Sequence, residues 1–171
     1  MARTTPAQKP RGSQRRILRG FFAVMAPRWG RGAREVKRNG EACGGPALAI
    51  LAARFRLFTA SNGNADLAKI GIAHLFERNV AARHVGALKP DPAIFHKTIE
   101  GTGLAPDEVA YVGDDPLMDV VGARRAGMLP IWINREGAAW PADIEPATHV
   151  ITSLDDLVEL TAASAAARPD R

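Results

Sequence analysis

Three carboxylates stand at the end of an apolar run in "YVGDDPLMDVVGARRAG", residues 111–127. A carboxylate at the end of a buried strand loses hydration, and a cation or hydrogen-bond donor must compensate it. Asp114 and Asp115 close the run, and Asp119 follows about one helical turn after Asp115, on the same helix face. Oxygen ligands of this kind suit Mg²⁺, which takes one or two carboxylates and keeps several waters. The pattern predicts a Mg²⁺ site at Asp114, Asp115 and Asp119.

Two other stretches could bind a phosphoryl group. The run "FRLFTAS" ends at Ser61, and Ser61, Asn62 and Gly63 offer a hydroxyl and turn amides to phosphate oxygens. The stretch "LKPDPAIF" offers Lys89 as a point cation directly before a proline. A hydroxyl, a lysine and a carboxylate-held Mg²⁺ together can neutralise the charge of a phosphoryl group in its transition state.

Apolar strand-like runs alternate with helix-like segments in the part of the chain that must position these residues. This alternation predicts an α/β fold with a mostly parallel sheet covered on both faces. Ligands of such sheets bind beyond the carboxyl ends of the strands, where all three stretches fall. Strands are expected within 55–60, 79–86, 109–113, 128–133 and 148–152, and helices within 47–55, 62–76, 92–100, 116–126 and 153–163. Asp91 before Pro92 is expected to cap the helix over 92–100, and Gly127 to end the helix over 116–126.

Each of these features also has a plain structural explanation. Asp114 or Asp115 could cap the helix expected over 116–126, Lys89 could be a solvated loop residue, and residues 61–63 could form only a turn. Taken singly, each explanation is at least as good as the functional one. Taken together they are weaker, because the three features lie at successive strand ends in the right order.

The composition divides the chain into a basic head and a mildly acidic body. The length of 171 residues suits one domain, and no apolar stretch approaches membrane-spanning length. Residues 1–60 carry 13 Lys and Arg against two acids, whereas residues 61–171 carry 10 against 16.

A single cysteine, Cys43, excludes an intramolecular disulfide framework and agrees with a reducing compartment, which we expect to be the cytoplasm. We divide the chain into a basic, disordered or irregular head (1–46), a core (47–162) and a tail (163–171).

The head is rich in Arg, Gly and Pro and sustains no periodicity. Its basic charge leaves nucleic-acid binding open, but it lacks interleaved aromatic residues and a reader fold, which disfavours nucleic acid as a partner. A secretory signal is disfavoured because the apolar patch at 21–25 is short, and a mitochondrial-type presequence stays open.

Residues 46–160 resemble the haloacid dehalogenase-like hydrolase superfamily, which consists mainly of Mg²⁺-dependent phosphatases. "LFTASNG" resembles its second motif, "LKPDPAIF" its third and "YVGDDPLMDVVGARRAG" its fourth. The resemblance implies that Ser61 contacts the phosphoryl group, that Lys89 steadies nucleophile and phosphate, and that Asp114 binds Mg²⁺ with support from Asp119. It gives Asp115 either a ligand or a loop-stabilising role. "SNGNAD" resembles the subgroup with a helical cap, and the implied fold is a Rossmann-like three-layer core.

The family's first motif, Asp-x-Asp at the end of the central strand, is absent. Its first aspartate is the family's nucleophile and its second the general acid/base, but the first aspartate of this chain is Asp66. We therefore expect a core that lacks its first, central strand and an intact cap. Phe21–Met25 could fill the gap, although "FFAVMA" looks more like part of the cap. "PRWGRGAREVKRNGEACGG" resembles out-of-frame translation, and we expect a truncated or frame-shifted member.

Three functions remain open from the sequence. The first is an active Mg²⁺-dependent phosphatase of a small phosphorylated metabolite. The second, which we favour because the nucleophile is missing, is a weakly active or inactive remnant that binds phosphate or Mg²⁺. The third is nucleic-acid binding through the head.

Overall fold

The computed structural model describes residues 21–24, 45–63 and 66–166. Its centre is one six-stranded sheet in the order β3-β2-β1-β4-β5-β6, and every neighbouring pair is parallel. This confirms the predicted α/β class and parallel sheet. The strands are β1 (Phe21–Val24), β2 (Leu57–Ser61), β3 (Arg78–Ala81), β4 (Val109–Gly113), β5 (Leu129–Ile133) and β6 (His149–Ile151).

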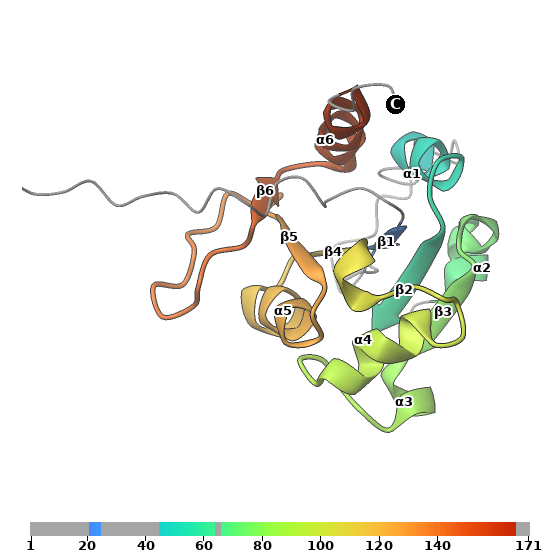
Figure 1. The fold of residues 1–171 in the computed structure, drawn as a ribbon, viewed down its shortest axis with the longest axis horizontal. Coiled ribbons are helices and arrows are strands. Elements are labelled where there is room, and N and C mark those ends of the chain that lie inside the picture. The colour runs from blue at the N-terminus through green and yellow to red at the C-terminus, as the bar shows by residue number, and fades with distance from the viewer. Residues whose placement is uncertain (1–20, 25–44, 64–65, 167–171) are drawn as a thin grey trace, which may run out of the picture.

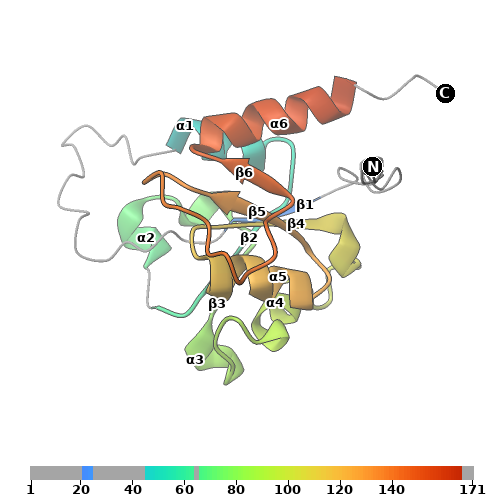
Figure 2. The same ribbon diagram turned by 90° about the vertical axis from the view of Figure 1, so that its left-hand side faces the viewer.

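Helices cover both faces of the sheet, as Figures 1 and 2 show. In Figure 2, α1 and α6 lie above the sheet, while α3, α4 and α5 lie below it. The helical elements are α1 (Gly45–Ala52), α2 (Leu67–Ile70), η1 (Ala73–Leu75), α3 (Ala82–Val85), α4 (Pro92–Ile99), η2 (Pro106–Glu108), η3 (Pro116–Val121), α5 (Gly122–Arg125) and α6 (Leu154–Ala166).

Two hydrophobic clusters form because β4 alternates its side chains between the two faces. Val109 and Tyr111 belong to the cluster under α4 and α5, together with Phe95. Ala110 and Val112 belong to the cluster under α1 and α6. The core is therefore the three-layer arrangement that the sequence predicted, with the sheet in the middle.

The prediction that the central strand is missing is wrong. β1, drawn blue in Figure 1, lies between β2 and β4 and pairs with both. Phe22 is in register with Leu57 on one side and Ala110 on the other. Four apolar residues are enough for a strand when both neighbouring strands offer backbone partners, because pairing removes two exposed edges. Residues 21–24 are therefore part of the sheet and not of a cap.

Local sequence signals set the ends of two helical segments. The side chain of Asp91 caps α4 by accepting a hydrogen bond from the backbone N–H of Ala93 at 2.8 Å, as predicted. The helix expected over 116–126 is divided into η3, a widened π-helical turn, and α5, and Gly127 ends it at φ 78°.

The described elements overlap the predicted division of the chain only in part. α6 continues to Ala166, beyond the predicted end of the core at 162. The predictions for the other residues of the head, for the absence of an intact cap and for the last residues of the tail lie outside the described residues. Within the described ranges, no helix is long and apolar enough to cross a membrane.

Candidate functional site

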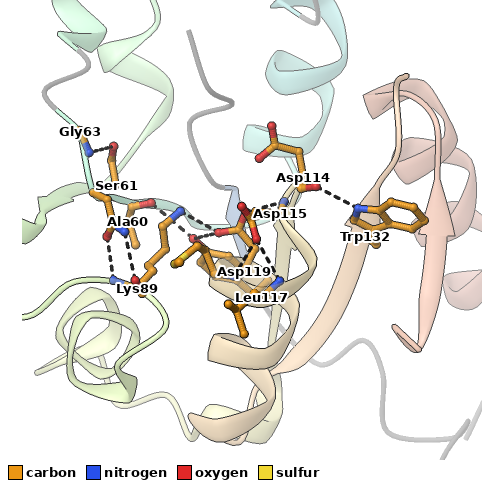
Figure 3. Close-up of polar contacts among 12 residues, drawn as sticks. Ala60, Ser61, Gly63, Lys89, Asp114, Asp115, Leu117, Asp119 and Trp132 are labelled. Carbon is orange, nitrogen blue, oxygen red and sulfur yellow. Dashed lines mark hydrogen bonds and ion pairs between the residues drawn. The ribbon is translucent and has the colours of Figure 1, made fainter. Parts of the chain in front are cut away.

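The candidate site lies at the carboxyl ends of β2, β1 and β4, three neighbouring strands of the sheet. Ser61 is the last residue of β2 and Gly113 the last of β4. Val24, the last residue of β1, is in register with Val112. This arrangement gathers the three predicted motifs at one edge, where ligands of parallel α/β sheets bind. Figure 3 shows their side chains together.

Lys89 and Asp119 form an ion pair that is almost fully removed from water. The Nζ atom of Lys89 lies 2.7 Å from Oδ1 of Asp119, and the two side chains are 5% and 1% exposed. The second oxygen of Asp119 accepts a hydrogen bond from the backbone N–H of Asp115 at 3.0 Å. Burial raises the pKa of Asp119, while the Lys89 ammonium and the Asp115 N–H oppose that rise. The pair therefore fixes the lysine ammonium at the site.

Asn62 holds the backbone of Lys89 from the neighbouring loop. Its Oδ1 accepts from the backbone N–H of Lys89 at 2.7 Å, and its Nδ2 donates to the carbonyl of Lys89 at 3.1 Å. The two bonds join the end of β2 to the loop before α4, across 27 residues of sequence. Sequence reasoning placed Asn62 against phosphate, so this bridging role was missed.

Ser61 keeps its hydroxyl at the same edge. Its Oγ accepts a hydrogen bond from the backbone N–H of Gly63 at 3.0 Å, which closes a short turn after β2. The residue is partly exposed and Gly63 is exposed, so the hydroxyl hydrogen can still be donated to a ligand. The turn and the ligand role are therefore compatible.

Asp115 and Asp119 each have structural partners. Oδ1 of Asp115 accepts from the backbone N–H groups of Leu117 and Met118, both at 2.9 Å, and so caps η3. The side chain of Asp119 packs against Gly113 where no side chain would fit, because a Cβ built on Gly113 would lie 2.2 Å from the Cβ of Asp119. The prediction that Asp115 and Asp119 bind Mg²⁺ stays a prediction.

Asp114 has a carboxylate oxygen without a partner. Its Oδ1 is buried and makes no hydrogen bond, although the residue as a whole is partly exposed. A buried, unpaired carboxylate oxygen is costly unless a cation or donor compensates it. Within the described ranges, no three acidic, histidine or cysteine side chains form a group that could hold a metal. The unpaired oxygen of Asp114 is compatible with a cation such as Mg²⁺, which needs only one or two protein carboxylates, and the binding of Mg²⁺ by Asp114 stays a prediction.

Tyr111 is a buried residue of the site that sequence reasoning assigned only to a strand. Its hydroxyl lies 3.5 Å from Oδ1 of Asp119 and 3.4 Å from the carbonyl oxygen of Ala60, at the long limit of hydrogen bonding. Burial, followed by the charge of Asp119, raises its pKa well above the usual value. The phenol therefore stays protonated and can only weakly support Asp119.

Comparison with known proteins agrees with this geometry. A family model described as haloacid dehalogenase-like hydrolase matches residues 58–133, which contain the second motif from Phe58 onward and the whole of the other two. A solved 2-haloacid dehalogenase from Pseudomonas syringae pv. Tomato DC3000 is 39% identical to this chain, with a TM-score of 0.66. The aligned region covers 70% of this chain and 51% of the dehalogenase chain. The chain belongs to the haloacid dehalogenase-like hydrolase superfamily. A haloacid dehalogenase-like phosphatase from Thermococcus onnurineus aligns similarly, at 32% identity and a TM-score of 0.61, covering 67% of this chain and 54% of its own.

Curated proteins that resemble this chain include phosphatases. Phosphoserine phosphatase of Thermus thermophilus is 40% identical over 96 residues, which is 53% of this chain and 35% of the relative. Glyceraldehyde 3-phosphate phosphatase of Methanopyrus kandleri is 41% identical over 69 residues, which is 40% of this chain and 30% of the relative. The chain thus spans roughly a third of the length of these relatives and about half of the solved structures above.

Proposed function

We propose that this chain forms a phosphate- and Mg²⁺-binding site of a hydrolase acting on small phosphorylated metabolites, and that its own hydrolytic rate is low. The superfamily and its phosphatase members support a hydrolase of phosphorylated substrates. The observation that carries the proposal is the buried Lys89–Asp119 pair beside Ser61 and the unpaired oxygen of Asp114. The single cysteine, Cys43, is in keeping with a cytoplasmic protein.

The charges at this edge suit a phosphoryl group. The ammonium of Lys89 supplies one positive charge at a fixed place, and the hydroxyl of Ser61 supplies a donor. A Mg²⁺ ion on Asp114 would supply further positive charge to the phosphate oxygens. Lys89 and Ser61 would hold and orient the phosphate, as the general electrostatic logic of phosphoryl transfer requires.

The low rate follows from the residues after β1. The family's nucleophile is expected directly after the central strand, and Met25, Ala26 and Pro27 follow Val24 in this chain. None of these carries a carboxylate, and no aspartate precedes Asp66. Without an attacking group, the remaining residues can bind the phosphoryl group but cannot form the covalent intermediate.

Restoring the two carboxylates tests the proposal. The full chain and the Met25→Asp/Pro27→Asp variant are assayed with p-nitrophenyl phosphate and Mg²⁺ at high protein concentration. We expect no release of p-nitrophenol above background from the unaltered chain, and measurable release from the restored variant. Asp114→Asn in the restored background serves as the control and should lower the rate again.

The same assay separates the alternatives. Strong hydrolysis by the unaltered chain that Asp114→Asn abolishes would show that the nucleophile lies elsewhere. Some similar proteins are haloacid dehalogenases, so a 2-haloacid is tested beside the phosphate ester. Halide release by the restored variant without phosphate release would contradict the assignment to phosphorylated substrates.

A further inference from the structure

Trp132 is hydrogen-bonded to the backbone of Asp114, the residue with the unpaired carboxylate oxygen. It lies on β5 in register with Gly113, the last residue of β4, and it is 4% exposed. Its indole Nε1–H donates a hydrogen bond to the backbone carbonyl of Asp114 at 2.9 Å (Figure 3). The bond joins the site to the next strand of the sheet, on the opposite side of Asp114 from Lys89.

Trp132 is itself fixed by the segment 134–148. The rings of Trp132 and Trp140 meet edge to face, with centroids 4.8 Å apart at 77°. The indole Nε1–H of Trp140 donates to the carbonyl of Ile144 at 2.7 Å. The guanidinium of Arg124 donates to the carbonyls of Glu145 and Pro146 at 3.1 Å and 2.6 Å, which ties the same segment to α5. These contacts leave the Trp132 ring little freedom to turn away from Asp114.

We propose that Trp132 is a positioning residue for the cation-binding carboxylate of Asp114, a role that rests on the proposed function above. The peptide of Asp114 is held by the indole, while the side-chain oxygen Oδ1 stays buried and unpaired. Outer partners that orient a ligating carboxylate commonly affect metal affinity strongly. A tryptophan that only fills the core would affect stability and leave Mg²⁺ affinity unchanged.

The test compares Mg²⁺ binding to the full chain and to two matched variants. Trp132→Phe removes the indole N–H and keeps an aromatic ring, whereas Trp140→Phe changes the neighbouring ring and leaves the bond to Asp114. Calorimetric titration with MgCl₂ gives the affinities, and thermal unfolding confirms that each variant folds. We expect Trp132→Phe to weaken Mg²⁺ binding about 10-fold, and Trp140→Phe to weaken it less.

A spectroscopic readout on the unaltered chain keeps the test decisive if Trp132→Phe does not fold. The chain has three tryptophans, so its ¹⁵N-labelled form gives three indole N–H signals. The Trp132 signal should shift as MgCl₂ is added, and the Mg²⁺ concentration at half of the full shift should match the affinity measured by calorimetry. The Trp140 signal should shift less.

The possible outcomes separate the two proposals. Mg²⁺ binding by the unaltered chain with no shift of the Trp132 signal, or with the same affinity in folded Trp132→Phe, would overturn the positioning role and leave the proposed function standing. No Mg²⁺ binding by the folded, unaltered chain would overturn both, because Asp114 would then have no cation to hold.

Discussion

Lys89 and Asp119 illustrate how much the burial of a charge depends on its partner. Each side chain would be costly to bury alone, and a 2.7 Å contact with the other makes the burial tolerable. The pair therefore contributes little net stability, but removing one member leaves an uncompensated charge. The pair instead fixes the ammonium group of Lys89 at a position where a bound phosphate could contact it.

Replacing Lys89 by methionine should destabilise the chain by about 3–5 kcal/mol, because Asp119 would be left buried and unpaired. Asp119→Asn in the Lys89→Met background should recover part of that loss, since the amide carries no charge. Urea unfolding of the single and double variants measures both effects. Lys97→Met is the matched control, because Lys97 and its partner Glu100 are exposed and an exposed ion pair contributes little to stability. Equal losses in Lys89→Met and Lys97→Met would contradict this account.

For single residues, the sequence predicted which side chains lie close together better than it predicted the role of each side chain. The three motifs that contain Ser61, Lys89 and Asp119 were all expected at the carboxyl edge of the sheet, and the structure gathers them there. The contacts of Asn62 with Lys89 and of Trp132 with Asp114 join residues 27 and 18 positions apart, on different elements. No local pattern encodes such contacts, because they depend on which strands lie side by side.

The elements around the site show how close packing limits substitution. Gly122 begins α5 and faces α4, and a Cβ built on it would lie 2.5 Å from Cζ of Phe95 and 3.1 Å from Cα of Pro90. Phe95 is fully buried and packs edge to face against Tyr111, so it cannot move aside without loss. The glycine thus lets α5 approach α4.

Gly122→Ala should lower the free energy of unfolding by about 1–3 kcal/mol, as overpacking of a close-packed core does. Chemical denaturation of the variant gives the value. Gly45→Ala is the comparison: Gly45 is in α1, and a Cβ there meets no described atom within 4 Å, so its effect should be small or stabilising. A Gly122→Ala variant as stable as Gly45→Ala would show that α5 can shift freely.

A second prediction for an element concerns the start of α6. Asp156 accepts hydrogen bonds from the backbone N–H and hydroxyl of Thr152, both at 2.7 Å, and from the N–H of Ser153, which lowers its pKa to about 2. The hydroxyl of Ser153 accepts in return from the N–H of Asp156. Because the pKa is lowered on folding, this stabilisation is present above pH 4 and is lost as the pH falls toward 2.

Asp156→Asn should therefore be less stable than the unaltered chain at neutral pH, and the difference should shrink between pH 4 and pH 2. Thermal unfolding of both proteins across this range measures it. A difference that stays constant with pH would show that the charge of Asp156 does not contribute.

Element boundaries were predicted where local chemistry sets them. Asp91 before Pro92 marked the start of α4, and Gly127 marked the end of the helical segment after the site. The widened turn η3 was not foreseen. There the backbone N–H groups of Asp119 and Val120 both approach the carbonyl of Asp115, at 2.9 Å and 3.3 Å, a geometry that depends on where β4 holds Asp115.

In the whole molecule, β1 joins the two halves of the sheet. It is the neighbour of both β2 and β4, so the sheet and its two clusters depend on four residues of an otherwise basic, irregular-looking head. Local composition predicted no element there with certainty, because a four-residue apolar run has no periodicity to recognise. Residues 21–24 form a strand because they pair with β2 and β4, and the local sequence pattern does not record this pairing.

Removing residues 1–44 should therefore leave β2 and β4 without their shared neighbour, and the shortened chain should aggregate or lose cooperative unfolding. Removing residues 1–20 keeps β1 and should leave thermal unfolding cooperative. Size-exclusion chromatography and calorimetric scans of both shortened chains give the comparison. Cooperative folding of the chain that starts at residue 45 would contradict the central position of β1.

The most direct test of the whole account is a calorimetric titration of the folded full chain with inorganic phosphate in the presence of Mg²⁺. We expect one phosphate bound per chain. Ser61→Ala should weaken the binding about 10- to 100-fold, since a hydrogen bond to a charged group contributes about 1.5–3 kcal/mol, while Ser61→Thr should retain it. No heat of binding from a cooperatively folded sample, or equal affinity in Ser61→Ala, would contradict the assignment of this edge of the sheet as a phosphate site.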